Sequence, residues 1–588
     1  MYKIVIKIRM IIKKMITRVR GALLFLFFLN VVFFSTVRAG QKYTIPFWSK
    51  ALQQRWSYSH SSPATWVKNV DLMNDRLLKV GQSHNINKLL ASDHFWRWVS
   101  QVYWSKQILI PYFHELESSS EAFDDCKALL SVDGLSEKSV RYIKASDNKI
   151  KFIEILSKLT AADEKKFKRY MNLALAIAIV WDEPFPDSWP HPNVNRSDIP
   201  ISNLDVLSLF NFFVSSHEDG RLKIGLDRLS VRELCFVIDT PVQLNELKYA
   251  QQIKLKSIRD LERLYKIIPY DQQRINSEAY EWPYGQYRLI DIGLKKGGIC
   301  MDQSYFASHA AKSQGIPSIL FMGQGRSGGH AWVGFLESRG RWKLNAARWA
   351  NEKYPVGFAY DPQTWQRISD TQFEFILISS GDSPSIGKGK IVLSWALLNQ
   401  GFPQFQPLLQ ASSKIMPRSK EPWQIELNYL KEKEANLDEM RIFWSRWIAN
   451  FKEEKGTKAK GQIELLKILR KLNLELAASK LSRQIISENR SGRFDLGVTV
   501  ASDEVFELQR SKNWDHAHRK YKVTLEQFKS SSGGHLFYNL IDPYVRNCML
   551  DRRLGEASDA LILAGKIIKP VKNTILYNDF EKLRSEVQ

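Results

Sequence analysis

The stretch GGICMDQSYFASHAAKSQGIPSILFMGQGRSGGHAWVGFLESRGRWKLNAARW, residues 297–349, decides the fold of the chain. Small and apolar residues recur at helical spacing over 301–313, and Gly315 and Pro317 follow them. This pattern predicts a helix that begins next to Cys300 and ends before the glycine. We therefore expect a cysteine in the first turn of a helix.

Cys300 is a candidate nucleophile. In the first turn of a helix its sulfur would meet unpaired backbone N–H groups and the positive end of the helix dipole, and both stabilise the thiolate. The thiolate is the reactive form of a cysteine. A lone cysteine also fits a plain core position, where it packs as a small apolar residue. The residues that follow decide between these two interpretations.

Three strands are predicted after the helix, at 316–322, 330–336 and 341–345. A hairpin tip at Glu337-Ser338 would place His330 directly opposite Asn345. Opposed residues share a face of the sheet with Cβ atoms about 5 Å apart, so the amide would hold one ring nitrogen while the other faces the sulfur. Cys300, His330 and Asn345 are thus the predicted nucleophile, general base and orienting residue. A register slip of one residue would separate the last two.

The motifs GIC, GIP, GHAWV and W-x-x-N, in this order and spacing, resemble the core of the transglutaminase-like superfamily. The resemblance covers about residues 240–365. It implies a fold similar to that of papain-like cysteine proteases, with Cys300 as the nucleophile and His330 as the general base and acid. It also implies a peptide or protein substrate.

The chain departs from the family pattern at the third position of the triad. Asn345 stands where most members have an aspartate, although papain-like enzymes use an asparagine in that role. A neutral amide stabilises an imidazolium less than a carboxylate does. Asp361 is a weaker candidate for this role, because it lies far beyond the hairpin. An aromatic residue upstream of the cysteine often shapes the oxyanion site in the family, and Trp282 is the nearest candidate.

Other patterns in the sequence indicate neither a bound cofactor nor a metal. Gly323-x-Gly325-x-x-Gly328 matches a dinucleotide-binding fingerprint, which needs a following helix, but a strand is predicted to follow it. His191 has no second histidine or cysteine near it, so no metal site is predicted there. The four cysteines form no C-x-x-C pair, and a free catalytic cysteine leaves an odd number, so we expect at most one disulfide.

The chain is strongly basic. Its 588 residues carry a formal net charge of +23, and residues 1–39 contribute eight positive and no negative charges, which leaves about +15 for the rest. This excess is densest between Lys452 and Arg483. Zinc-finger, RNP-like and homeodomain patterns are missing, so nucleic-acid binding is not predicted. The charge fits contact with an anionic cell-wall polymer or membrane surface, or simply a solvated basic face.

Residues 1–39 are predicted to be a secretory signal peptide. A basic and apolar stretch precedes a hydrophobic run over 22–37, and Val37-Arg38-Ala39 places small residues at the cleavage-determining positions. The run is short for a membrane-spanning helix. We therefore expect a secreted, periplasmic or surface-held protein, with an uncleaved membrane anchor as the alternative.

The rest of the chain divides into four predicted regions. Residues 40–199 are a helical N-terminal region that ends in a proline-rich break. Residues 200–380 hold the transglutaminase-like core, closed by a strand over 373–378. Residues 381–420 begin with glycine, serine and proline and are predicted to be a linker, and residues 421–588 are helical. The predicted fold class is thus an α+β papain-like core flanked by two mainly α-helical regions.

The C-terminal region contains a repeat of forty residues. A large residue, an alanine three positions later and a second large residue four positions beyond that occur at 474–481, 514–521 and 554–561. This spacing suits helix pairs that stack as a solenoid, similar to tetratricopeptide packing, and equally suits three ordinary amphipathic helices. Under either interpretation we expect this region to bind a protein partner.

Two functions are consistent with these residues. The first is an extracytoplasmic cysteine-dependent acyl transferase or peptidase, in which Cys300 attacks an amide or peptide carbonyl, His330 moves protons and Asn345 orients the ring. This chemistry requires no metal or other cofactor. The second is a catalytically weak or inactive transglutaminase-like protein that binds peptides or cell wall, which the asparagine in place of an aspartate favours.

Overall fold

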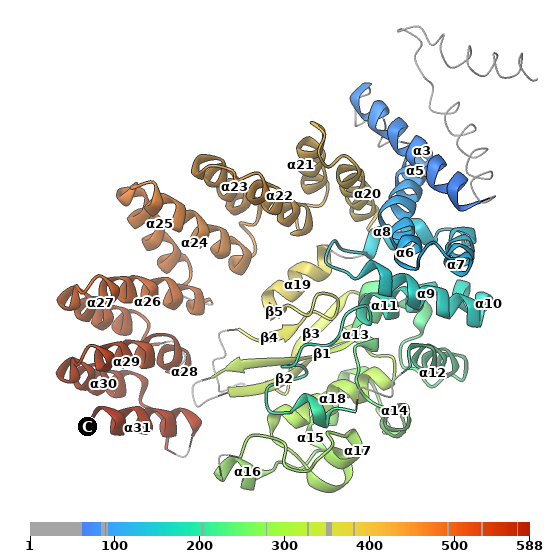
Figure 1. The fold of residues 1–588 in the computed structure, drawn as a ribbon. Coiled ribbons are helices and arrows are strands. Elements are labelled where there is room, and N and C mark those ends of the chain that lie inside the picture. Colours follow the sequence, from blue (N-terminus) through green and yellow to red (C-terminus); the bar gives the residue numbers. More distant parts are fainter. Residues whose placement is uncertain are drawn as a thin grey trace, which may run out of the picture.

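The computed structural model describes residues 62–588, except 84–88, 90–91, 201–204, 278, 326–328, 349–355, 380–382, 491–492, 531–532 and 573. The predicted signal peptide lies outside the described residues. The described chain is mainly helical and contains one small antiparallel sheet, so it is an α-rich protein with a small α+β region (Figure 1). None of the helices in this part of the chain combines the length and the apolar character that crossing a membrane requires.

The N-terminal helices and the sheet region share one hydrophobic core. Its buried side chains run from Trp66 to Met416, and Trp104 meets Phe152 within it with ring centroids 6.1 Å apart. The N-terminal helices are α3 (Pro63–Ser83), α5 (Asp93–Trp104), α6 (Ile110–Glu115), α7 (Ser120–Ser131), α8 (Leu135–Tyr142), α9 (Lys149–Ala162), α10 (Glu164–Arg169) and α11 (Met171–Val180), with a π-helical turn η1 (Ser105–Leu109) between α5 and α6.

The helices after the proline-rich break surround the sheet. They are α12 (Val206–Glu218), α13 (Val231–Ile238), α14 (Leu244–Gln251), α15 (Glu262–Lys266), α16 (Gln272–Asn276), α17 (Leu289–Asp291) and α18 (Cys300–Ser313). Helix α18 begins at the cysteine, as predicted, and both α14 and α15 pack against it. All of its side chains except Met301 are buried, so α18 is the central helix of this region.

The sheet has five antiparallel strands in the order β3-β2-β1-β4-β5. They are β1 (Ser318–Gln324), β2 (Gly329–Ser338), β3 (Arg341–Ala346), β4 (Phe358–Tyr360) and β5 (Arg367–Ser369). Successive residues of a strand point to opposite faces. In β2, Ala331 and Val333 face the core that contains α18, whereas Trp332 packs with Phe236 and Phe373 on the other face.

The predicted register of the central hairpin is wrong. The strands β2 and β3 turn at Arg339-Gly340, and Val333 pairs with Ala346. The predicted tip at Glu337-Ser338 lies two residues too early. Gly340 has φ of 68°, a conformation that glycine adopts without strain, and this fixes the later turn.

The strand predicted over 373–378 is a helix, α19 (Asp370–Ser379). Ser369 and Gln372 cap its start, because the Gln372 N–H donates to the Ser369 hydroxyl and the Ser369 N–H donates to the Gln372 side-chain oxygen, each at 3.2 Å. This S-x-x-Q capping box starts a helix, and it prevails over the alternation that suggested a strand.

The segment 381–420, predicted to be a linker, folds as two helices, α20 (Pro384–Leu398) and α21 (Phe405–Ile415). Ser383 is the N-cap of α20 and Pro384 occupies its first turn, so residues typical of a linker here start a helix. Trp395 of α20 packs on Phe95 of α5 with ring centroids 5.0 Å apart. The linker prediction is therefore wrong, and this segment belongs to the main core.

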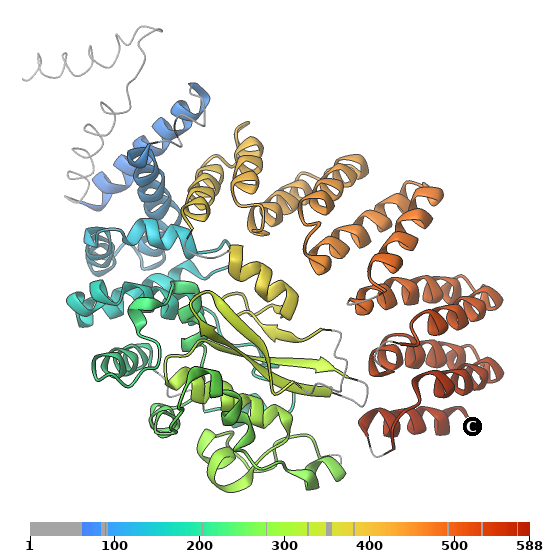
Figure 2. The ribbon, with the colours of Figure 1, turned by 180° about the vertical axis from the view of Figure 1, so that it is seen from behind.

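From α20 onward the helices stack along an arc that curves back towards the sheet (Figure 1, Figure 2). We call α22 to α31 the C-terminal array. Its helices are α22 (Glu421–Glu432), α23 (Leu437–Asn450), α24 (Lys455–Lys471), α25 (Glu475–Glu488), α26 (Phe494–Arg510), α27 (Trp514–Gln527), α28 (Gly533–Leu536), the π-helical η7 (Phe537–Ile541), α29 (Asp542–Leu550), α30 (Leu554–Ile568) and α31 (Ile575–Val587).

One kind of turn recurs along the C-terminal array. Glu434, Asn473, Lys512 and Arg552 have φ between 52° and 60°. After each of them, the N–H of the next residue donates to the carbonyl oxygen five positions earlier, at 2.8 or 2.9 Å, which is the Schellman pattern of a helix end. These turns are spaced 39, 39 and 40 residues apart, close to the period of forty in the sequence.

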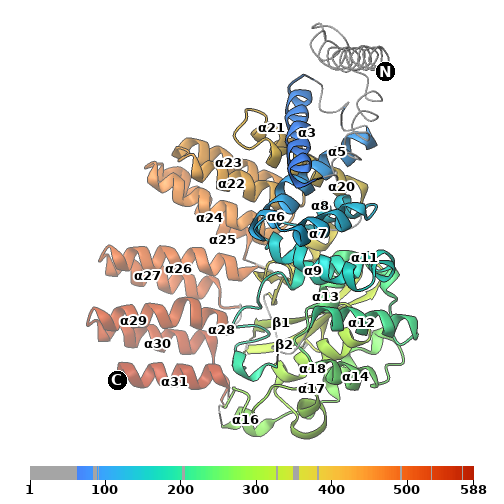
Figure 3. The same cartoon turned by 45° about the vertical axis from the view of Figure 1, so that its right-hand side comes forward.

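The C-terminal array packs on the rest of the molecule through α22, which contacts α21, and through α24, which contacts α19. Thr371 of α19 donates to Glu454 at 3.4 Å, just before α24, and Arg493 donates to the Thr371 hydroxyl at 3.3 Å. Near the far end, α28 and η7 lie beside the sheet region (Figure 3). There, burial and a hydrogen bond to a carboxylate raise the pKa of Tyr538, and Tyr280 of the sheet region adds to that rise.

Candidate active site

Cys300 is the first residue of α18. Two glycines precede it, at positions where the backbone passes too close to neighbouring atoms to leave room for a side chain. Gly297 has φ of 70°, and a side chain there would overlap the carbonyl oxygen of Pro269, while a side chain at Gly298 would overlap Asp302. Cys300 is buried, with 8% of its surface exposed.

The Cys300 sulfur lies in the helix that packs against β1 and β2. Strand β3 pairs with β2 as far as Val333. The backbone N–H groups of Ala331, Met301 and Cys300 interact with the sulfur and lower the pKa of Cys300. Burial raises the pKa of Cys300 to about 11, and the Asp302 carboxylate adds to the rise that these N–H groups oppose. The resting group is therefore a thiol, and not the thiolate expected from the helix start, because burial outweighs the helix N-terminus.

His330 precedes Ala331 in β2 and is buried. Its Nε2 atom lies 3.0 Å from the carbonyl oxygen of Ala347. Because a carbonyl oxygen only accepts, Nε2 carries the proton of the neutral ring and Nδ1 has the lone pair. The ring is flanked by Tyr265, with centroids 6.5 Å apart, and by Trp332, at 6.2 Å. In the neutral ring, Nδ1 is thus the atom that can accept a proton. The ring shares the face of β2 that carries Trp332, which is opposite to the face of Ala331.

Asn345 does not lie opposite His330. Because Val333 pairs with Ala346, Asn345 lies near the middle of β2, and its side chain is exposed. The predicted pairing of His330 with Asn345 is therefore wrong, and the contact to Nε2 comes from the backbone of Ala347.

A buried polar network supports the first turn of α18. Asp302 accepts the N–H of Ile299 at 2.8 Å, Nη1 of Arg274 at 2.7 Å and the hydroxyl of Tyr287 at 2.8 Å. The Tyr287 hydroxyl lies 2.8 Å from Nε2 of His191, whose pKa burial lowers to about 3. The sequence analysis missed this network. Its signal was the acidic residue in the first turn of the predicted helix.

Tyr270 is an aromatic residue that the structure places close to Cys300. It forms a parallel bridge with Gly298, two residues before the cysteine, and it is 40% exposed. Burial, and next the charge of Cys300, raise the pKa of Tyr270 to about 12. Trp282, the aromatic residue predicted for the oxyanion site, is buried and packs on Tyr287 with ring centroids 5.1 Å apart.

Asp361, the second candidate for the orienting role, is part of a buried ion pair with Arg232. Burial alone would raise the pKa of Asp361, but Arg232 and Lys144 hold it well below its usual range. All four cysteines are free, in agreement with the expectation of at most one disulfide. Within the described residues, His, Cys, Asp and Glu side chains form no group of three or more that could hold a metal ion.

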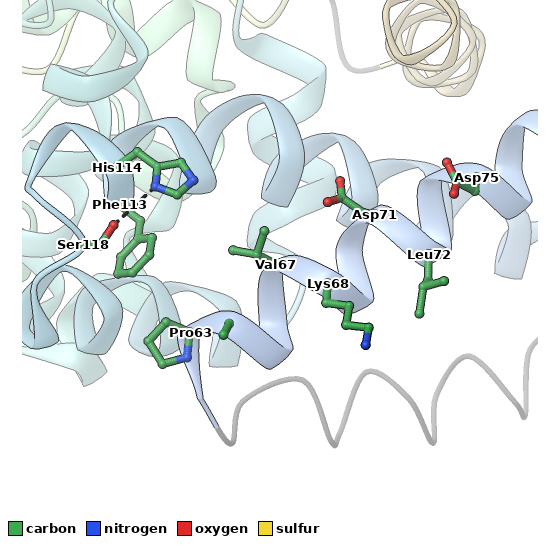
Figure 4. Close-up of a pocket in the computed structure, with 10 residues that line it drawn as sticks. Pro63, Val67, Lys68, Asp71, Leu72, Asp75, Phe113, His114 and Ser118 are labelled. Atoms are coloured by element: carbon green, nitrogen blue, oxygen red, sulfur yellow. Dashed lines mark hydrogen bonds between the residues drawn. The ribbon is translucent and has the colours of Figure 1, made fainter. Parts of the chain in front are cut away.

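A groove of about 610 Å³ opens between α3 and α6 (Figure 4). Within it, Nδ1 of His114 lies 3.3 Å from the Ser118 hydroxyl. The groove is lined by Pro63, Ala64, Val67, Lys68, Asp71, Leu72, Asp75, Phe113, His114 and Ser118. None of these residues belongs to the surroundings of Cys300, so the groove is separate from the candidate active site.

Comparison of the chain with family models, with curated proteins and with solved structures finds no match. The chemistry of this site is therefore argued from its own residues.

Proposed function

We propose that the chain is a cysteine-dependent acyl transferase or peptidase of the transglutaminase-like type, with Cys300 as its nucleophile and His330 as its general base. One observation carries the proposal: the Cys300 sulfur meets the N–H of Ala331, the neighbour of His330, whose ring is held by Ala347. A helix that starts at the cysteine and packs on an antiparallel sheet supports the likeness to a papain-like core.

The proposed reaction begins with a thiol, because the pKa of Cys300 is raised to about 11. Nδ1 of His330 takes the sulfhydryl proton while the sulfur attacks the carbonyl carbon of an amide. The carbon–nitrogen bond then breaks, and His330 returns the proton to the departing amine. A thioester on Cys300 remains, and water or a second amine attacks it. In this scheme the Ala347 carbonyl takes the orienting role predicted for Asn345.

We propose a peptide or protein substrate outside the cytoplasm. The hydrophobic run and small residues at 22–39 support export of the chain, with an uncleaved anchor as the alternative. The positive charge that remains beyond residue 39 supports contact with an anionic cell-wall polymer or membrane surface. The C-terminal array supports binding of a protein partner, because stacked helix pairs present an extended surface.

The test uses p-nitrophenyl acetate, an activated ester that needs no specific binding pocket. The wild-type protein should release about one equivalent of p-nitrophenolate per chain in a rapid phase. Cys300→Ala should abolish this phase, and His330→Gln should slow it by about 100-fold or more. Cys126→Ala, which changes a fully buried thiol, is the matched control. A rapid phase that persists in Cys300→Ala, or that is missing from the wild type, would overturn the proposal.

The second candidate function is a peptide- or wall-binding protein without turnover. The burial of Cys300 and the raised pKa of its thiol favour it. In that case Cys300→Ala should bind peptides or wall fragments as tightly as the wild type, with no ester hydrolysis by either protein. Isothermal titration, run beside the ester assay, separates the two functions.

A further inference from the structure

The first turn of α18 holds a carboxylate close to the nucleophile. Asp302 lies two residues after Cys300, and it accepts the N–H of Ile299, the residue just before the cysteine, at 2.8 Å. Asp302 thus fixes the backbone that carries the sulfur. It also places a negative charge where a thiolate would form, and a like charge disfavours ionisation.

Arg274 of α16 opposes this charge from a fixed position. Its Nη1 donates to Asp302 at 2.7 Å, and its Nη2 donates to the carbonyl oxygens of Tyr280 at 2.7 Å and Glu281 at 3.0 Å. Its Nε donates to the Ala279 carbonyl at 3.2 Å. The side chains of Arg274 and Asp302 are 5% and 1% exposed, so water screens their charges little.

Two tyrosines near Cys300 are neutral at physiological pH. Burial raises the pKa of Tyr270 to about 12 and that of Tyr287 well above its usual value. The His330 ring is the proton acceptor of the proposed reaction. Among the described residues, the titratable groups around this site include Asp302 on α18, Arg274 on α16, Tyr270 before α16, Tyr287 before α17 and His330 on β2. Tyr284 and Asp271 lie next to them, because both interact with Arg274.

We propose that the buried Arg274–Asp302 pair tunes the reactivity of the nucleophile: Asp302 positions Cys300 and adds to the effect of burial against the thiolate, and Arg274 limits that addition. The inference rests on the proposed function in taking Cys300 as the reacting group, and it assigns two positioning residues to the same site. The site would then hold an inactive thiol until a substrate brings the sulfur and His330 into reaction.

The experiment measures the rate at which iodoacetamide alkylates Cys300 between pH 6 and 10, by mass spectrometry of the peptide that contains it. Asp302→Asn keeps the size of the side chain and removes its charge. It should speed alkylation at pH 8 by about tenfold, which is the factor expected when the pKa of Cys300 falls by about one unit. Arg274→Gln should act in the opposite direction and slow alkylation at pH 8. Glu526→Gln, which removes an exposed carboxylate on α27, is the control and should leave the rate unchanged.

An unchanged pH profile in Asp302→Asn would overturn the inference. Faster alkylation in both Asp302→Asn and Arg274→Gln would overturn it too, because that result indicates only a loosened helix start. The ester assay distinguishes a failure of the proposed function. If the two variants shift alkylation in opposite directions but the wild type shows no rapid ester phase, the inference holds and the proposed acyl transfer is refuted. If the rapid ester phase is present but alkylation is unchanged in both variants, only the inference is refuted.

Discussion

The Nε2 atom of His330 lies 3.0 Å from the carbonyl oxygen of Ala347, and Ala347 itself has φ of 62°. The left-handed conformation costs a residue with a Cβ atom about 1–2 kcal/mol. Such strain persists where the surrounding structure enforces it, and it concentrates at functional sites. The Ala347 carbonyl oxygen, which orients the His330 ring, is therefore held in place by an unfavourable backbone conformation.

Ala347→Gly should stabilise the protein, because glycine adopts a positive φ without the steric cost. We expect an increase of about 0.5–1 kcal/mol in the free energy of unfolding. Ala346→Gly, one residue earlier in β3, is the matched control and should destabilise by a similar amount, since glycine weakens a strand. Urea unfolding measures both changes. Shifts of the same sign in the two variants would show that Ala347 is not strained.

Asn345→Ala should leave the rapid ester phase within about twofold of the wild type, because surface substitutions away from a site have small effects. The side chain of Asn345 is exposed and is not opposed to His330. A loss of more than about tenfold, comparable to general-base effects, would instead restore the triad predicted from the sequence.

Gly298→Ala should destabilise the protein by about 1–3 kcal/mol, because a Cβ atom there would overlap the side chain of Asp302. Gly555→Ala in α30 is the control, since its added methyl group would meet no atom within 4 Å. We expect the control to be neutral or to gain up to about 1 kcal/mol, because alanine favours a helix. Equal effects of the two substitutions in urea unfolding would contradict the close approach at Gly298.

The sequence predicted α18 and the strands β1, β2 and β3 because each has a strong local signal. The helix has its apolar spacing and terminating residues, and the strands are apolar runs divided by glycine-rich turns. The hairpin register failed for a physical reason. Ser338 and Gly340 both suit a turn, and the strands turn at Gly340, which adopts the positive φ that the turn needs. A shift of two residues in the tip was enough to replace Asn345 with the Ala347 backbone.

Capping residues account for the helices that the sequence analysis missed. Ser369 with Gln372, and Ser383 with Pro384, start helices in segments that composition assigned to a strand and a linker. The buried Arg274–Asp302 pair could not be predicted, because its members lie 28 positions apart and meet only in the folded chain.

Stability should fall as the pH rises, because of Asp182. Burial, and next the charge of Asp147, raise the pKa of Asp182 to about 8, from about 3.9 in the unfolded chain. The folded state therefore binds the proton more tightly. This contribution to stability is fully present below about pH 4 and is lost as the pH rises towards 8.

Asp182→Asn should make the free energy of unfolding depend less steeply on pH. The slope should decrease by between several tenths of a kcal/mol and about 1.4 kcal/mol per pH unit. Urea unfolding at pH 5, 6.5 and 8 measures the slope. Asp219→Asn, which changes a largely exposed carboxylate, is the control and should leave the slope as it is. A slope that survives in Asp182→Asn would assign the pH dependence to other groups.

The return of the C-terminal array to the sheet region constrains how many helix pairs the chain can hold. Open solenoids gain or lose units during evolution at little cost, because each unit touches only its neighbours. Here α28 and η7 lie beside the sheet region, and Tyr280, whose carbonyl oxygen accepts from Arg274, adds to the raised pKa of Tyr538. One unit more or fewer between α24 and α27 should therefore change where Tyr538 lies relative to Tyr280. The number of helix pairs in the array thus determines whether its last helices lie beside the sheet region.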